Sequence, residues 1–231
     1  MSSITIVLAD KYFKKDPQSS DLGRKIVSEG LAMLDELGFE EFTFKKLADR
    51  IDSTEASVYR YFKNKHKLLV YLTTYYWSWL AYVIEFETHH IEEASAKLDR
   101  VIDIICHAYD LPKILDLPSL NISKLRRVID NESDKTYLNR QVDEINRKGL
   151  FTGYKELCGK ITSVIQELKP EYQYPKALVS TILEASHQQT FFAHHLPSLT
   201  ELEVNGHCVL EKQSADFIKH TISSVLKNPE T

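Results

Sequence analysis

Apolar residues recur at helical spacing along most of the chain. In one short stretch Phe44, Leu47, Ala48 and Ile51 follow the i, i+3, i+4, i+7 pattern that places four side chains on one face of a helix. Only seven of the 231 residues are glycine and seven are proline, so few positions interrupt such stretches. The pattern predicts an all-α protein. It predicts further helices near residues 65–88, 92–109, 119–131, 135–148, 150–168, 175–194 and 208–227.

Residues 43–67 have the pattern of a helix-turn-helix. Thr43 is the expected N-cap of a first helix, because its hydroxyl can accept from the free amides of the first turn. Asp52 follows that helix and tolerates the left-handed conformation of a tight turn, although less readily than glycine. Thr54 is the expected cap of a second short helix. In helix-turn-helix proteins the second helix enters the major groove of DNA.

The second helix and its surroundings carry hydroxyl, phenol and basic groups, which bind phosphates and base edges. The predicted DNA-binding residues are Thr43, Lys45, Thr54, Glu55, Ser57, Tyr59, Arg60, Tyr61 and Lys65. We expect Glu55, Ser57, Tyr59, Arg60 and Tyr61 on or near the outer face. Glu55 has two interpretations. Its carboxylate weakens binding if it faces phosphates, whereas it accepts from a cytosine amino group if it faces a base.

Charge is unevenly distributed along the chain. The formal net charge is −4, but residues 43–67 contain seven Lys or Arg and three Asp or Glu, which makes this segment +4 and the remainder −8. Such asymmetry suits a protein that presents one basic end to DNA and repels DNA elsewhere. A charged surface on an ordinary helical protein would give the same count by chance.

The stretch from about Leu22 to Leu72 resembles the N-terminal domain of the TetR family of bacterial transcriptional regulators. In the four-helix numbering of that family, the end of the first helix appears here as Leu34, Leu37, Gly38 and Phe39, and the second helix as Thr43 and Ala48. The third helix, which is the recognition helix, appears as Thr54, Ser57, Val58, Tyr59, Tyr61 and Phe62. The start of the fourth helix appears as Lys63 and Lys65. The chain departs from the family pattern at Asp52, where a turn glycine is usual, at Ser53, where an apolar residue is common, and at Glu55, where a basic or small residue is frequent.

The resemblance implies an N-terminal three-helix helix-turn-helix domain followed by a helical-bundle ligand-binding and dimerisation domain. The expected boundaries are residues 1–20 for a flexible extension, 21–68 for the helix-turn-helix domain and 69–231 for the helical domain. In the extension, Lys11, Lys14 and Lys15 could reach a minor groove, as N-terminal arms do in some helix-turn-helix proteins. A solvated tail is the simpler expectation.

The helix expected at residues 65–88 is rich in aromatic side chains. In the family, the corresponding helix connects the DNA-binding domain to the ligand domain. Packing between domains is the simpler explanation of the aromatic density, and a ligand cavity lined with rings is the second. Under the second explanation, the candidate pocket residues are Tyr75, Trp79, Tyr82 and Phe86.

The last two helices of the family usually pair with their copies in a second subunit as a four-helix bundle. In this chain the residues that best fit an apolar stripe on those helices are Leu178, Ile182, Ala185, Phe192, Phe217, Ile218, Thr221 and Val225. They fit an intrachain core equally well, because every helix of a folded protein needs a buried stripe.

Catalytic and metal-binding motifs are not evident in the sequence. We find no glycine-rich phosphate loop, nucleophile elbow or paired-carboxylate motif, so we expect no enzyme activity and no cofactor. His89 and His90 are adjacent, as are His194 and His195. Adjacent residues point about 100° apart on a helix and do not share one face. We therefore expect no metal site.

The remaining sequence features indicate a cytoplasmic protein. Cys106, Cys158 and Cys208 are an odd number, far apart, and are expected to be free thiols in a reducing compartment. No run of eighteen apolar residues exists and the N-terminus lacks a signal-peptide pattern, so we expect neither a membrane span nor membrane association.

The resulting functional prediction is a TetR-like transcriptional regulator, a repressor that binds a near-palindromic DNA operator as a homodimer. The expected effector is a small, largely apolar molecule of unknown identity. Two alternatives remain at this point. One is a helical ligand-binding sensor dimer whose DNA binding has decayed, which the departures at Asp52, Ser53 and Glu55 motivate. The other is a helical enzyme, for which no sequence feature names a reaction.

Overall fold

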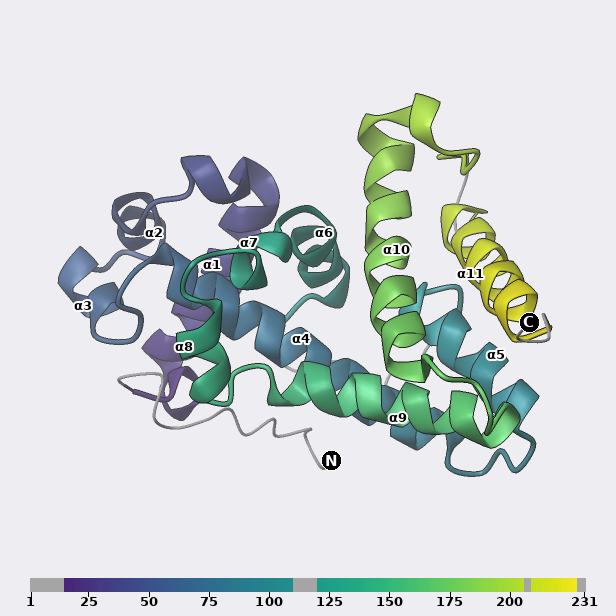
Figure 1. Ribbon diagram of the computed structural model, residues 1–231. Coiled ribbons are helices and arrows are strands. Elements are labelled where there is room, and N and C mark those ends of the chain that lie inside the picture. The colour runs from purple at the N-terminus through teal and green to yellow at the C-terminus, as the bar shows by residue number, and fades with distance from the viewer. Residues whose placement is uncertain (1–14, 110–119, 206–208, 228–231) are drawn as a thin grey trace. The chain divides into compact units, whose positions relative to one another are not determined.

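The computed structural model describes residues 15–109, 120–205 and 209–227, and every regular element in these ranges is helical (Figure 1). The α-helices are α1 (Asp21–Glu41), α2 (Phe44–Arg50), α3 (Glu55–Tyr59), α4 (Lys65–Thr88), α5 (Ala94–Ile105), α6 (Ile122–Glu132), α7 (Asp134–Tyr137), α8 (Val142–Arg147), α9 (Thr152–Leu168), α10 (Pro175–His195) and α11 (Val209–Lys227). Two 3₁₀ turns, η1 (Pro17–Ser19) and η3 (Pro197–Leu199), accompany them. The predicted all-α fold is confirmed.

The helix predicted at 135–148 is wrong, because this stretch forms two short helices, α7 and α8. The break begins at Leu138, whose φ of −84° and ψ of 56° lie outside the helical region. The Asn139 side chain then accepts a hydrogen bond from the amide of Gln141 at 2.8 Å, a local bond that competes with a helical one. By contrast, the helix predicted at 65–88 is present as α4.

The described residues form two compact units. The first takes its residues from 1–78 and 113–153, and the second from 79–112 and 154–231. Helices α6, α7 and α8 therefore belong to the same unit as the helix-turn-helix segment. Helix α4 contributes its first part to the first unit and its last part to the second.

Within the first unit, α1 packs against α6 and is fixed to it at its C-terminal end. Gly38 interrupts α1 with a φ of 72°, a conformation that favours glycine. The following amide, that of Phe39, donates a hydrogen bond to the Glu132 carboxylate at 2.8 Å. Near the same end, Arg127 of α6 donates two hydrogen bonds to Asp35, at 2.8 and 2.7 Å. These contacts set where α1 ends and the segment leading to α2 begins.

Glu132→Ala is expected to lower the free energy of unfolding by about 1–2 kcal/mol, because the Phe39 amide loses its acceptor. Urea denaturation followed by circular dichroism measures the change. Glu132→Gln keeps an acceptor oxygen and should recover at least half of the loss. Equal stability of wild type and the alanine variant would show that the hydrogen bond contributes nothing.

Residues 15–20 are not a solvated tail in this structure. Pro17 is buried, the Gln18 side chain donates to the Tyr71 hydroxyl at 2.9 Å, and Ser20 caps α1 by accepting from the Gly23 amide at 3.2 Å. Residues 1–14, with Lys11 and Lys14, lie outside the described residues.

The start of α9 also lies close to α4 within the first unit. A Cβ atom on Gly153 would approach the Ser78 side-chain oxygen to 2.2 Å, so only glycine permits this approach. Nearby, the Thr74 hydroxyl donates to the Leu150 carbonyl oxygen at 3.0 Å. Val70 and Leu150 belong to one buried apolar cluster beside these contacts.

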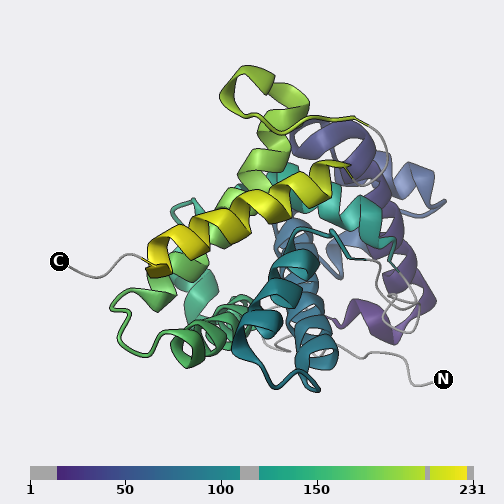
Figure 2. The same cartoon turned by 90° about the vertical axis from the view of Figure 1, so that its right-hand side faces the viewer.

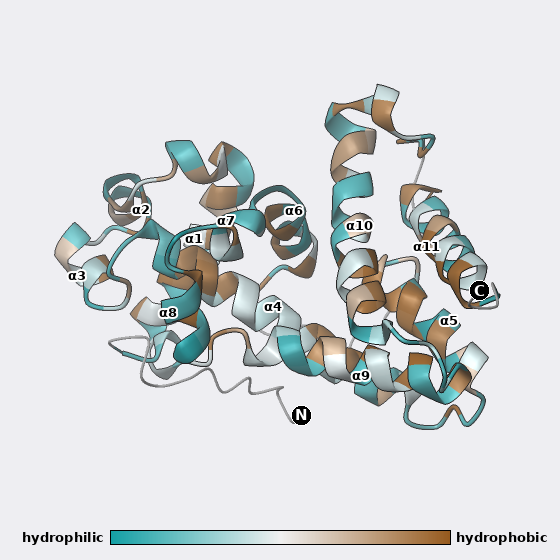
Figure 3. Ribbon diagram, viewed as in Figure 1, coloured by the Kyte–Doolittle hydropathy of each residue, from teal (hydrophilic) through white to brown (hydrophobic). Residues whose placement is uncertain are grey.

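In the second unit, α10 packs against α11, and α11 packs against α5 (Figures 1 and 2). Lys219 of α11 forms an ion pair with Asp103 of α5 at 2.6 Å, and the Ser214 hydroxyl donates to the Cys106 sulfur at 3.7 Å. Hydrophilic and hydrophobic stretches alternate along α10 and α11, as expected for helices with one buried face (Figure 3).

Among the described residues, Cys106 and Cys158 are free cysteines, as predicted, whereas Cys208 lies outside them. Burial raises the pKa of the Cys158 thiol to about 11, and the Glu184 carboxylate acts in the same direction. Tyr154, one helical turn before Cys158, donates its hydroxyl to Glu184 at 2.9 Å and thereby joins α9 to α10.

Alkylation of Cys158 at pH 8 is expected to be about a hundredfold slower in the folded protein than in the unfolded chain, because thiolate is the reactive form and its pKa is raised. The rate should climb as the pH approaches 11. Iodoacetamide labelling with peptide mass spectrometry, with and without urea, measures both rates. Equal rates would contradict the half-buried position of this thiol.

Candidate DNA-binding surface

Helices α2 and α3 are joined by a short capped turn. The Thr43 hydroxyl accepts from the Lys46 amide and the Thr54 hydroxyl from the Ser57 amide, each at 3.2 Å, so both predicted N-caps are confirmed. Asp52 occupies the left-handed region with a φ of 53°, and the Ser53 amide donates to the Ala48 carbonyl at 2.9 Å. The turn therefore forms without a glycine.

A compact apolar layer lies beneath the two helices. Leu47, Val58 and Phe62 are fully buried within it. The Phe44 ring contacts the Tyr59 ring edge to face, with centroids 5.1 Å apart. Tyr59 nevertheless keeps 44% of its surface exposed.

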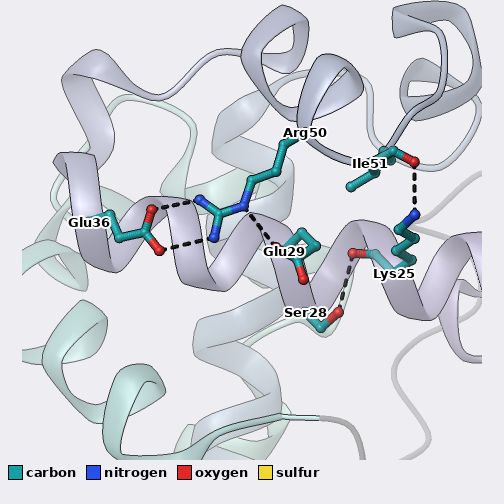
Figure 4. A network of polar contacts seen from close by, with 6 residues as sticks. All are labelled: Lys25, Ser28, Glu29, Glu36, Arg50 and Ile51. Atoms are coloured by element: carbon teal, nitrogen blue, oxygen red, sulfur yellow. Dashed lines mark hydrogen bonds and ion pairs between the residues drawn. The ribbon is translucent and has the colours of Figure 1, made fainter.

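A polar network fixes α2 on α1 (Figure 4). Arg50, at the end of α2, donates to Glu36 at 2.6 and 3.0 Å and to Glu29 at 2.8 Å. Lys25 of α1 donates to the carbonyl oxygen of Ile51 at 2.9 Å. The hydrogen bonds to Glu36 and Glu29 raise the pKa of Arg50, so the guanidinium stays charged. Arg50 is thus occupied in positioning the turn.

The expectation that Tyr61 lies on the outer face is wrong. Only 2% of its surface is exposed, and its hydroxyl is 2.7 Å from the Ser20 hydroxyl and accepts from Lys15 at 3.2 Å. The reason is that the backbone stays helical at Arg60, and Tyr61 lies three positions after the buried Val58, on the same face as Val58. Both partners lie more than 40 positions away in the sequence and could not be inferred from local spacing.

Lys65 lies at the start of α4 and has a structural role. Its ammonium group donates to the carbonyl oxygens of Phe39 at 2.8 Å and Glu40 at 2.9 Å, and it lies over the Phe39 ring. These bonds satisfy carbonyl groups at the end of α1. The predicted phosphate contact of Lys65 stays a prediction, and only its third proton is available for it.

A set of exposed side chains remains on this module. Lys45, Arg60 and Lys63 are exposed, and no hydrogen bond or ion pair holds their side chains within residues 15–109, 120–205 and 209–227. Glu55 is partly exposed, and its side chain also forms no hydrogen bond or ion pair within these ranges. Lys63 is not among the DNA-binding residues predicted from the sequence, although its charge directly after the recognition helix is a signal that points to it. We call Lys45, Glu55, Tyr59, Arg60 and Lys63 the exposed HTH set.

The four candidate pocket residues do not share one environment. Tyr75 is buried and belongs to the first unit, whereas the other three belong to the second. Trp79 is buried and stacks near His107, with ring centroids 6.4 Å apart. Tyr82 and Phe86 are exposed over more than two fifths of their surfaces and stack on one another at 6.4 Å. Their assignment to a pocket stays a prediction.

The candidate dimer residues separate into two groups. Leu178, Ile182 and Ile218 are buried within the second unit, where α10 packs on α11, and serve the intrachain core. The others are at least partly exposed and remain available to a partner: Ala185, Phe192, Phe217, Thr221 and Val225.

Two further properties of the described residues bear on function. No three or more His, Cys, Asp or Glu side chains among them are grouped so that they could hold a metal ion. None of the helices in those ranges is sufficiently long and apolar to cross a membrane.

Comparison with known proteins shows which family the helix-turn-helix segment matches. The family model described as bacterial regulatory proteins of the tetR family matches residues 26–72, which span most of α1, all of α2 and α3 and the first part of α4. Residues 26–72 therefore match the N-terminal domain of the TetR family. No curated protein matches the sequence significantly.

Solved structures with the same fold cover nearly the whole chain. A TetR-family regulatory protein from Rhodococcus RHA1 has a TM-score of 0.61 at 12% identity, over 91% of this chain and 100% of that one. AibR, solved with isovaleryl coenzyme A and operator DNA, has a TM-score of 0.57 at 13% identity, and the match covers 86% of this chain and 97% of AibR. The ketosteroid transcriptional regulator KstR2 of Mycobacterium tuberculosis has a TM-score of 0.53 at 13% identity, and the match covers 90% of this chain and 96% of KstR2. At such identities the likeness establishes the fold alone.

Proposed function

We propose that the protein is a transcriptional repressor that binds a near-palindromic operator as a homodimer and is released by a small, largely apolar effector. The observation that carries the DNA-binding part is the exposed HTH set. Three of its five side chains are cations without a protein partner among the described residues. Arg60 and Lys63 come after the recognition helix α3, and Lys45 lies on α2. Free cations of this kind are what phosphate binding requires.

The geometry of the turn between α2 and α3 argues against the alternative of a sensor dimer whose DNA binding has decayed. Asp52 adopts the left-handed conformation that the turn needs, and Thr54 still caps α3. The turn therefore forms with an aspartate at the position where the family usually has glycine. In the proposal, α3 enters the major groove, Tyr59, Lys45 and Lys63 contact phosphates, and Arg60 contacts a base edge or a phosphate.

The dimeric state is supported by the apolar groups that remain accessible on the last helices. Phe217 of α11 has 40% of its surface exposed, and Phe192 of α10 is partly exposed. Exposed apolar side chains that gather on paired helices are typical of association surfaces. A dimer would present two copies of α3 to successive major grooves about 34–36 Å apart.

The proposal names the chemical class of the effector and no single compound. The neighbour AibR was solved with an acyl coenzyme A, and KstR2 is described as a ketosteroid regulator. The ketosteroid description agrees with a small, largely apolar effector for this chain, whereas an acyl coenzyme A is apolar only in its acyl chain and is otherwise polar and anionic. A ligand that binds the folded state at a concentration of 100 Kd should add about 2.7 kcal/mol of stability. A thermal-shift screen of acyl coenzyme A esters and sterols therefore identifies candidates.

Selection of bound sequences from random duplex DNA tests the proposal, together with light scattering of the free protein and of the complex. The expected result is a palindromic site, a dimer mass, and an affinity that falls steeply as salt rises. An effector from the screen should weaken DNA binding, and DNA should weaken its binding by the same factor. Sequence-independent weak binding by a monomer would overturn the proposal.

A further inference from the structure

Glu55 is the acid of the exposed HTH set, whose other charged members are the cations Lys45, Arg60 and Lys63. It lies in the first turn of α3, directly after the capping residue Thr54. Its side chain is partly exposed and makes no hydrogen bond or ion pair within the described ranges. The cap bond to the Ser57 amide comes from Thr54, so Glu55 is not needed to satisfy the backbone of the turn.

Three other acids of the same module are held by protein cations. Glu29 and Glu36 of α1 accept from Arg50, and Glu41 pairs with Lys46 at 3.5 Å. Arg60 is exposed on the same segment and forms no pair with Glu55. The Glu55 carboxylate is therefore both accessible and uncompensated.

The chemistry of duplex DNA limits where such a carboxylate can lie. Phosphate oxygens repel it, and in the major groove guanine presents only acceptors. Cytosine presents the N4 amino group, a donor without a neighbouring acceptor on the same base edge, and carboxylates accept from it. Adenine also presents a donor, but its N7 acceptor lies beside it and repels a second carboxylate oxygen.

We propose that Glu55 is a specificity-determining residue that selects a cytosine at one position of each operator half-site by accepting from its N4 amino group. The inference rests on the proposed DNA binding and deepens it, because it names the base that this side chain reads. Glu55 adds little affinity for DNA in general, since a carboxylate opposes the phosphate field, but it penalises sites that place another base at its position.

Glu55→Gln is the informative variant, because it keeps the size of the side chain and replaces an acceptor-only group with an amide. A Gln side chain makes a bidentate pair with adenine N6 and N7. Selection from random duplex DNA should therefore change one preferred position in both half-sites from cytosine to adenine. Replacing that C·G pair by T·A should weaken wild-type binding about tenfold or more and the Glu55→Ala variant less than twofold.

Asp49→Asn provides the matched control. Asp49 is an exposed acid on α2 of the same module, and its side chain makes no hydrogen bond or ion pair within the part of the chain that the structure describes. The variant therefore removes the same charge without changing α3. It should keep the wild-type sequence preference and raise affinity for all sequences alike. A change of base preference in both variants would assign the effect to charge alone and overturn the inference.

The outcomes separate this inference from the proposed function. Selective binding by wild type with an unchanged preference in Glu55→Gln would overturn the role of Glu55 and leave the regulator intact. No selective binding by wild type would overturn both. A switch from cytosine to adenine confined to Glu55→Gln would establish that Glu55 reads this base.

Discussion

Phe62→Ala is expected to destabilise the protein by about 3–5 kcal/mol and to abolish operator binding at 37 °C. Phe62 is fully buried directly after the recognition helix, and its ring contacts the Tyr71 ring edge to face, with centroids 5.5 Å apart. Truncation removes this ring pair and leaves a cavity between the end of α3 and α4. Urea denaturation monitored by circular dichroism measures the change in stability.

The reason for a functional loss is the length of α3. A helix of five residues has no stability of its own, so its direction depends on the apolar layer beneath it. Leu138→Ala is the control, because Leu138 belongs to the same unit but has 74% of its surface exposed. It should change stability by less than about 0.5 kcal/mol. A destabilisation below about 1 kcal/mol for Phe62→Ala would mean that this layer does not support α3.

The triple variant Lys45→Ala, Arg60→Ala and Lys63→Ala is expected to weaken operator binding at least about a hundredfold. The three cations are exposed and free of protein partners among the described residues, so their removal weakens the attraction to DNA and leaves the fold intact. The slope of log affinity against log salt should become shallower by about 0.9 for each phosphate that the variant no longer neutralises. Fluorescence anisotropy of a labelled operator at several salt concentrations measures both quantities.

A second triple variant controls for overall charge. Arg140, Lys176 and Lys212 are also exposed cations, but they lie outside the helix-turn-helix segment. Their replacement by alanine lowers the net charge by the same amount and should change operator affinity less than about threefold. Equally weakened binding in the two triple variants would show that net charge, and not the exposed HTH set, governs binding.

The parts of the module that were predictable from sequence are those determined by neighbouring residues. Thr43 and Thr54 cap their helices through bonds that span three positions, and Asp52 takes the left-handed conformation that follows a short helix. Spacing of apolar residues was sufficient to predict α2 and the long helix α4. These features are local in sequence, so pattern alone determines them.

The features that sequence reasoning missed depend on partners far along the chain. The Tyr61 hydroxyl is bound by Lys15 and Ser20, and Lys65 is occupied by carbonyl groups at the end of α1. The residue type and position of Arg50 also suit DNA binding, but its guanidinium forms ion pairs with Glu29 and Glu36 of α1. No spacing rule identifies such pairings from one sequence.

The same limit applies to the last two helices. The apolar stripe of α10 and α11 was visible in the sequence, but its division between core and accessible residues was not. Ile218 is fully buried and its neighbour Phe217 is exposed, although both are large apolar residues. Burial depends on where α5 and α11 pack, which is a property of the folded unit.

Lysine footprinting with and without operator DNA tests most directly that the exposed HTH set is the DNA-binding surface. The reactivity of each lysine toward an acetylating reagent is read by peptide mass spectrometry. We expect DNA to protect Lys45 and Lys63 and to leave Lys176 and Lys212 unchanged, although all four are exposed in the free protein. Protection of Lys176 and Lys212, with Lys45 and Lys63 still reactive in the complex, would contradict the account.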